Sequence, residues 1–217
     1  MPEVRVMLDQ HLLPEVDPST AIRAIYGQHF PWLVWLDAPW AETRVAKIFP
    51  TSAPQGRLHA AAWEAYLTYC EPQSTTFPLL HAQYAYAIAQ FESEPQTAAA
   101  LSTVTEHLVT HLVLLYGRGV LDLDDPDGLL ARFYLTAPDV ARGRVIEEAG
   151  RRFSVPDDAV DSEVIERFIQ LWERRLAEVQ QSPDNPAHAH EMAAFSWWFI
   201  SGKFDNAWAM TQLMAAL

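Results

Sequence analysis

The chain has 217 residues, of which half are hydrophobic and 12% are aromatic. This composition supplies enough apolar surface for a continuous core and excludes a disordered chain, in which too little apolar surface would be buried to offset the entropy of ordering. The net charge is −13, from 28 acidic and 15 basic residues. An acidic balance disfavours nonspecific binding to nucleic acid or anionic lipid, so we expect neither as a partner.

The cysteine content and the N-terminus indicate the cellular compartment. Cys70 is the only cysteine, which excludes an intramolecular disulfide framework and a cysteine-based zinc site, and we interpret it as a small buried residue. The N-terminus carries Glu3 and Asp9 instead of a basic stretch followed by a long apolar run, so it does not resemble a signal peptide. No run approaches the roughly 20 apolar residues of a membrane span. We therefore expect a cytoplasmic protein without membrane contact.

Helix starts are marked by proline, which suits the first helical position. An Asp or Asn that can cap the helix precedes the proline at Asp17-Pro18, Asp125-Pro126 and Asn185-Pro186. Between these marks the apolar residues recur with helical period, and no stretch alternates with period two for long enough to predict a strand. In chain order, the pattern predicts helices over 3–13, 18–28, 31–37, 39–48, 57–70, 77–91, 96–117, 127–136, 139–153, 161–181, 186–201 and 203–216.

The predicted fold is all-α, with a single helical domain over residues 1–217. We expect an irregular helical-repeat stack of about 10 to 12 helices, similar to an α–α superhelix or solenoid, and a compact helical bundle fits the same pattern. The stretch 96–117 is apolar nearly all round, which predicts a central helix covered on several sides. It would divide the domain into an aromatic, proline-rich half, 1–95, and a half of helical pairs, 96–217.

Two histidines on the predicted central helix form a candidate metal site. His107 and His111 lie four residues apart, so both side chains point the same way, as two imidazoles do in helix-borne zinc sites. No Glu follows His107, and the sequence places no third ligand. We interpret the pair as histidines packed at the flank of a core helix, and a small helical enzyme or metal-binding protein is the alternative. No other motif predicts catalysis, so we expect no catalytic residue and no cofactor.

Two further polar clusters are interpreted as local structure. His188, His190 and Glu191 follow Asn185-Pro186 and indicate an exposed helix start in preference to a metal site. The acidic run that begins at Asp122 has the wrong register for a calcium loop, because Asp127 stands where the loop needs Gly and Phe133 where it needs Glu. This run predicts a turn and an acidic cap for a helix that begins at Pro126.

Aromatic residues gather in two groups, Trp32/Trp35/Trp40 and Trp197/Trp198/Phe199/Phe204/Trp208. Core packing between helical pairs is the simplest interpretation, but adjacent helical residues point about 100° apart, so one of Trp197 and Trp198 would reach a second layer or a partner. The chain closes on the apolar segment 210–217 without the polar cap that solenoids usually need. We therefore expect a protein partner or the remainder of a larger chain at this end. The predicted interface residues are Trp197, Trp198, Phe204, Trp208, Met210, Leu213, Met214 and Leu217.

Three runs, 121–126, 129–134 and 194–205, together with Ala137-Pro138, resemble stretches in the helical C-terminal regions of very large bacterial proteins. Those proteins look like multidomain NTPase-type or sirtuin-type anti-phage defence proteins. The resemblance covers mainly residues 120–217 and rests on structural residues, so it carries over no catalytic residue. It implies a sensing or scaffold region whose enzymatic domain lies upstream. The sequence favours a noncatalytic helical-repeat module that binds a protein partner, and it leaves the oligomeric state open.

Overall fold

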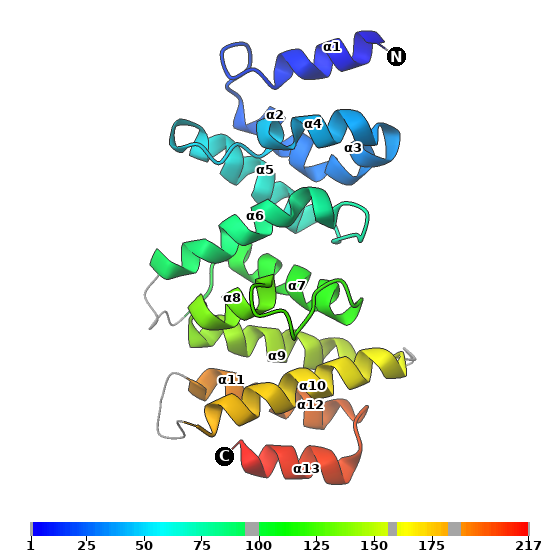
Figure 1. Ribbon diagram of the computed structural model, residues 1–217, viewed down its shortest axis with the longest axis vertical. Helices are drawn as coiled ribbons and strands as arrows, with labels where there is room; N and C mark the ends of the chain where they lie inside the picture. The colour runs from blue at the N-terminus through cyan, green and yellow to red at the C-terminus, as the bar shows by residue number, and fades with distance from the viewer. Residues whose placement is uncertain (1, 94–99, 156–159, 182–187, 217) are drawn as a thin grey trace. The chain divides into compact units, whose positions relative to one another are not determined.

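The computed structural model describes residues 2–93, 100–155, 160–181 and 188–216, and these residues form helices and turns with no strand among them (Figure 1). The predicted all-α class is thus confirmed. The chain divides into two compact units, residues 1–84 and 85–217, and the division falls within α6 (Phe77–Ala89). No helix in the described part of the chain is long and apolar enough to cross a membrane.

The first unit consists of helices joined by short turns. Ser19 caps its second helix by accepting the N–H of Ile22, while Asp17 holds the preceding turn by accepting the N–H of Ser19 at 3.0 Å. Asp37 caps the fourth helix by accepting the N–H of Trp40. All of these helices begin within two residues of their predicted starts. They are α1 (Pro2–His11), α2 (Thr20–Gln28), α3 (Phe30–Leu36), α4 (Ala38–Ile48), α5 (Gly56–Tyr69) and the first part of α6.

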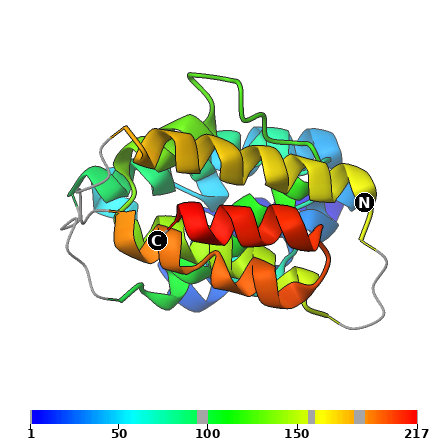
Figure 2. The same cartoon turned by 90° about the horizontal axis from the view of Figure 1, so that it is seen from below.

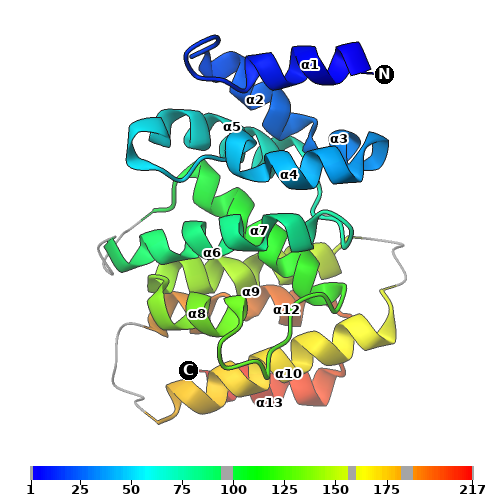
Figure 3. The same cartoon turned by 45° about the horizontal axis from the view of Figure 1, so that its top comes forward.

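The core of the first unit forms where α2 lies against α5 (Figure 3). A Cβ atom added at Gly27 of α2 would lie 1.9 Å from the carbonyl oxygen of Ala62 in α5, so only glycine allows the two backbones to approach this closely. Aromatic rings fill the remaining space with edge-to-face and stacked contacts, and the buried members are Phe30, Phe49, Trp63, Tyr66, Phe77 and Tyr84.

The helices of the second unit lie in layers. The helix α9 contacts α7, α11 and α12 and lies between α7 and the pair α11 and α12 (Figure 1). Figure 2 shows α13 beside α10, to which Gln212 and Trp208 join it by hydrogen bonds. This order fits a stack of helices, and the repeat character stays a prediction. Beyond the end of α6, the helices are α7 (Thr103–Gly117), α8 (Leu129–Thr136), α9 (Asp139–Phe153), α10 (Ser162–Val179), α11 (Ala189–Ala193), α12 (Ser196–Ser201) and α13 (Asn206–Ala215).

The predicted central helix corresponds to α7. Its residues from Leu108 to Tyr116 are buried around most of the helix, including Val109, Val113 and Leu115, as the all-round apolar pattern predicts. The helix begins later than expected, at Thr103, because the hydroxyl of Ser102 accepts the N–H of Thr105 at 3.2 Å and caps the N-terminus. Residues 96–99 of the predicted range lie outside the described residues.

The predicted helix over 186–201 is wrong as a single helix, since it forms the two short helices α11 and α12. At the break, Phe195 and Trp198 donate their N–H groups to carbonyls three residues earlier, as in a 3₁₀ turn. Three-residue spacing brings Met192, Phe195 and Trp198 onto one face, and all three are buried. A continuous α-helix would turn these side chains progressively away from one another.

The predicted start of the eighth helix at Pro126 is also wrong, because α8 begins at Leu129. Asp125 folds a turn in place of capping a helix. Its carboxylate accepts the N–H of Asp127 at 3.1 Å, and its carbonyl accepts the N–H of Gly128 at 3.1 Å. The prediction of a turn in this acidic run is confirmed, and only the role of Asp125 as a helix cap is not.

Candidate functional site

The C-terminal aromatic residues that were predicted as an interface include core residues. Trp198 and Phe204 are 0% and 6% exposed, and the indole of Trp198 donates to the carbonyl of Ile146 at 2.6 Å. Both rings pack against Phe153 of α9. Because neighbouring helices cover these side chains, the interface prediction is wrong for Trp198 and Phe204. Trp208 is half-buried, and its indole donates to Glu173 at 3.0 Å.

The remaining predicted interface residues in the described part of the chain are partly exposed. Trp197 is 37% exposed, and the guanidinium of Arg151 lies 4.8 Å from the centre of its ring. Met210 and Met214 are 48% and 66% exposed, and Leu213 is half-buried. Leu217 lies outside the described residues. An interface at this end stays a prediction for Trp197, Trp208, Met210, Leu213 and Met214.

The two histidines of the candidate metal site differ in their surroundings. His111 is 2% exposed inside α7, whereas His107 is half-buried. Among the residues that the structure describes, no group of three or more His, Cys, Asp or Glu side chains lies close enough to hold a metal ion. The burial of His111 agrees with packing at the flank of a core helix, and metal binding by the pair stays a hypothesis.

Cys70 is half-buried and lies at the C-terminal end of α5. Its thiol donates to the carbonyl oxygen of Gln28 at 3.0 Å. Burial raises the pKa of Cys70 to about 11. Since the thiolate is the reactive form of cysteine, this environment makes Cys70 a weak nucleophile at neutral pH.

A buried ionic cluster in the second unit was missed by the sequence reasoning, which interpreted Glu191 as part of an exposed helix start. That interpretation is wrong, because Glu191 is 0% exposed and its carboxylate accepts from two buried arginines. Arg175 of α10 donates through two nitrogens, at 2.6 and 3.0 Å. Arg142 of α9 donates at 3.3 Å and also binds the carbonyl of Ala137 at 2.6 Å. The carboxylate therefore joins α9, α10 and α11.

Further side chains extend this cluster. Asp139 at the start of α9 accepts the backbone N–H groups of His190 and Glu191, at 2.8 and 3.1 Å. The guanidinium of Arg175 also stacks over the ring of Tyr134, 4.3 Å from its centre. Burial by itself would lower the pKa of Arg175, but the hydrogen bonds and the charge of Glu191 outweigh it and raise that pKa above its ordinary value. The arrangement is that of a structural joint between helices.

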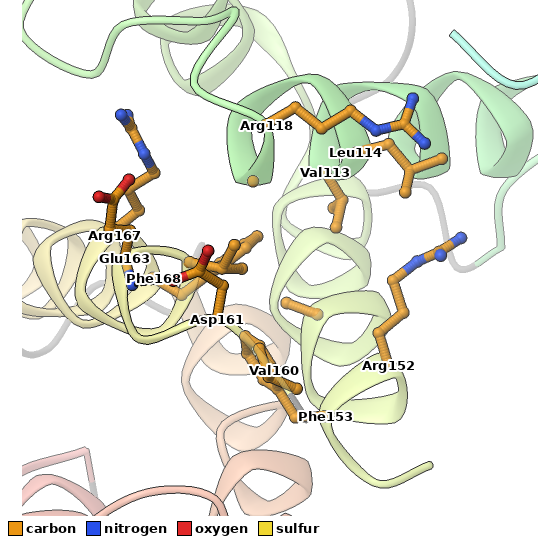
Figure 4. A pocket seen from close by; sticks show the side chains of 13 residues that line it. Val113, Leu114, Arg118, Arg152, Phe153, Val160, Asp161, Glu163, Arg167 and Phe168 are labelled. Carbon is orange, nitrogen blue, oxygen red and sulfur yellow. Dashed lines mark hydrogen bonds between the residues drawn. The ribbon is translucent and has the colours of Figure 1, made fainter. Parts of the chain in front are cut away.

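A pocket of about 460 Å³ lies between α7, α9 and α10, with an apolar floor that includes Phe153 and Phe168 (Figure 4). Arg118 and Arg152 stand on one side of it, and Arg167 stands on the other. Arg152 is already paired with Glu148 at 3.0 Å, and the guanidinium of Arg167 lies against Gly119. The pocket can accommodate an apolar group, and we assign no ligand to it.

Two strongly exposed tryptophans lie in the first unit. Trp32 and Trp35 are 62% and 75% exposed, and Leu36 beside them is 68% exposed. We call these three residues the tryptophan surface. The third tryptophan of this group, Trp40, is 7% exposed, and its indole donates to Asp9 at 3.2 Å, so the interpretation as core packing is confirmed only for Trp40.

The local sequence explains why α3 presents these side chains. All seven of its residues, FPWLVWL, are apolar, yet only Phe30 is buried, where its ring meets Phe49 edge to face at 5.3 Å. A short helix that packs along one face must expose apolar residues elsewhere when its sequence has no polar face. This all-apolar heptapeptide was the signal in the sequence that could have identified the surface.

Comparison with known proteins adds no further assignment, because no protein-family model, curated protein or solved structure matches this chain.

Proposed function

We propose that this chain is a noncatalytic helical module that binds a protein partner, and that the tryptophan surface is its principal contact. The observation that supports this proposal is the exposure of Trp32 and Trp35. Burying the exposed part of one such side chain would contribute roughly 2 to 4 kcal/mol, from an area of about 150 to 250 Å² for a whole tryptophan. Residues that dominate protein interfaces contribute about this much, and tryptophan is enriched among them.

The wider setting of the proposal comes from the resemblance of residues 120–217 to the helical ends of bacterial defence proteins. We propose that the module, of helical-repeat type, belongs to such an assembly in the cytoplasm, where nucleic acid is not its partner. The arginines of α9 support the last point, since Arg144, Arg151 and Arg152 pair with carboxylates of the same helix. The neighbouring coding sequence tests the setting, and an upstream NTPase or sirtuin-type domain is the expected result.

Site-specific photo-crosslinking in the native host tests the interaction itself. A photoreactive amino acid at position 36 lies beside both tryptophans, one at position 214 samples the C-terminal surface, and one at the exposed position of Glu64 serves as the control. We expect a discrete adduct from position 36 that disappears when Trp32 and Trp35 are both changed to Ala. Equal adducts from positions 36 and 64, or an adduct that survives the double change, would contradict the proposal.

A further inference from the structure

A shallow depression of about 340 Å³ lies on the tryptophan surface, and its described lining consists of Pro31, Trp32, Trp35 and Gln73. None of these four side chains carries a charge, although the chain as a whole has a net charge of −13. The volume lies within the range of small ligand sites and suits a few residues of a peptide. The inference below rests on the proposed function and specifies the chemistry of the partner.

The walls of the depression are aromatic and lie on an anchored helix. The rings of Trp32 and Trp35 are 5.5 Å apart and nearly perpendicular, at 87°, so one presents its face beside the edge of the other. The helix that carries them is anchored at one end by the buried ring of Phe30 and at the other by Asp37, which caps α4 and binds Arg5 at 2.5 Å. A ligand would thus meet a surface that is already in place, which reduces the entropy lost on binding.

The polar groups of the depression offer hydrogen-bond donors. In the part of the chain that the structure describes, the indole N–H groups of Trp32 and Trp35 and the side-chain amide of Gln73 have no protein partner. The loop that carries Gln73 is nevertheless fixed, because its carbonyl accepts the N–H groups of Thr76 and Phe77 at 3.1 and 2.9 Å. The residues that line this uncharged aromatic depression therefore carry three donor groups without a protein partner.

We infer that this depression binds a proline-rich segment of the partner in the polyproline II conformation. Proline has no backbone N–H, and a polyproline II helix forms no internal hydrogen bonds, so its carbonyls need donors from the receptor. Its rings pack against aromatic walls, and its stiffness keeps the ordering cost low. An uncharged lining with two perpendicular tryptophan rings and with indole and amide donors matches these requirements in both hydrogen bonding and charge.

A cationic peptide is the competing ligand, because tryptophan faces also attract ammonium and guanidinium groups. The affinity of such a site for a cation is highest when a free carboxylate lies nearby, and the described lining contains no carboxylate. Asp37, the carboxylate that follows α3, is already bound to Arg5. The charges therefore favour the uncharged ligand.

The test is a titration of the isotopically labelled full chain with decaproline, followed through the indole N–H signals in NMR spectra. Trp32→Phe and Trp35→Phe variants assign the two signals. At about 1 mM peptide, where a complex with a millimolar Kd is half formed, we expect both signals to shift. A Gly-Ser peptide of equal length should shift neither. Trp32→Ala and Trp35→Ala should each weaken binding at least about tenfold, as for residues at the centre of an interface.

Ile25→Ala is the matched control, since Ile25 is an exposed apolar residue of the same unit that does not line the depression. It should leave the Kd for decaproline unchanged. The inference fails if decaproline shifts neither indole signal, or if the Trp32 signal shifts as strongly in Trp35→Ala as in wild type. It also fails if decalysine shifts the two signals and decaproline does not. If one of these results is found together with a crosslinked adduct from position 36, the proposed function stands and only the proline-rich ligand is rejected.

Discussion

Arg23 in the first unit and Arg175 in the second are both buried, 1% and 4% exposed, but they bind different partners. Arg23 donates to the carbonyls of Leu12 and Lys47, at the C-terminal ends of α1 and α4, where the helix dipoles are negative. Arg175 instead shares the carboxylate of Glu191 with Arg142. Burial lowers the pKa of Arg23 below its ordinary value, whereas Glu191 raises the pKa of Arg175 despite burial.

The difference shows two ways to join helices. In the first unit a single charge is dispersed over backbone dipoles, so breaking the joint leaves neutral groups unpaired. In the second unit the joint depends on a charged side chain at its centre, so removing that charge takes from two buried arginines the carboxylate that they share. A buried charge that loses its main partner costs more than an unpaired carbonyl. We therefore expect the second unit to be more sensitive to substitution at its ionic joint.

The largest effect is expected from Glu191→Gln. This change keeps the size of the side chain but removes the carboxylate that Arg142 and Arg175 share. Arg175 keeps its pair with the partly exposed Glu178, and Arg142 keeps Asp139 at 3.9 Å. The free energy of unfolding should therefore fall by about 3 to 4 kcal/mol, toward the lower end for a broken buried pair. Urea denaturation followed by tryptophan fluorescence measures the change. Glu147→Gln, which breaks only partly exposed pairs with Arg144 and Arg151, should cost about 1 kcal/mol or less. Equal costs for the two variants would contradict a special role for the buried joint.

Gly27→Ala should have the next largest effect and tests the first unit through its backbone. The added methyl group would lie 1.9 Å from the carbonyl oxygen of Ala62, so α2 and α5 must separate, at a cost of about 3 kcal/mol. Gly56→Ala at the start of α5 is the matched control. A Cβ there meets nothing within 4 Å, so this change should stabilise the protein by about 0.4 to 1 kcal/mol. A loss of stability below 1 kcal/mol for Gly27→Ala would mean that the helix pair adjusts easily.

The helix boundaries were largely predictable from the sequence, because proline and apolar period act over a few residues. The joints were not, because they link residues far apart in the chain: Glu191 is 16 residues from Arg175 and 49 from Arg142. The sequence also does not predict which individual tryptophans are buried. Trp32 and Trp40 both follow a proline closely in the sequence, and only the packing of α3 and α4 makes one exposed and the other buried.

Arg23→Met should have a smaller effect than Glu191→Gln. The methionine would fill much of the space, but the carbonyls of Leu12 and Lys47 would lose their donor, at a cost of about 1 to 3 kcal/mol. Urea denaturation again measures the change, with the exposed Arg57→Met of α5 expected within about 0.5 kcal/mol of wild type. If Arg23→Met costs as much as Glu191→Gln, the distinction between backbone-bound and carboxylate-bound arginines fails.

The smallest effect concerns pH and the first unit alone. His59 is 7% exposed and lies 3.0 Å from the amide oxygen of Gln83, and burial lowers its pKa below 6.5. Between the folded pKa and 6.5 the unfolded chain binds more protons than the folded one, so stability falls as pH falls through this window. Above pH 6.5 the group has no effect. Urea midpoints between about pH 5 and 8 should therefore decline less toward low pH in His59→Gln than in wild type. Identical slopes in the two proteins would show that His59 does not make the first unit sensitive to acid.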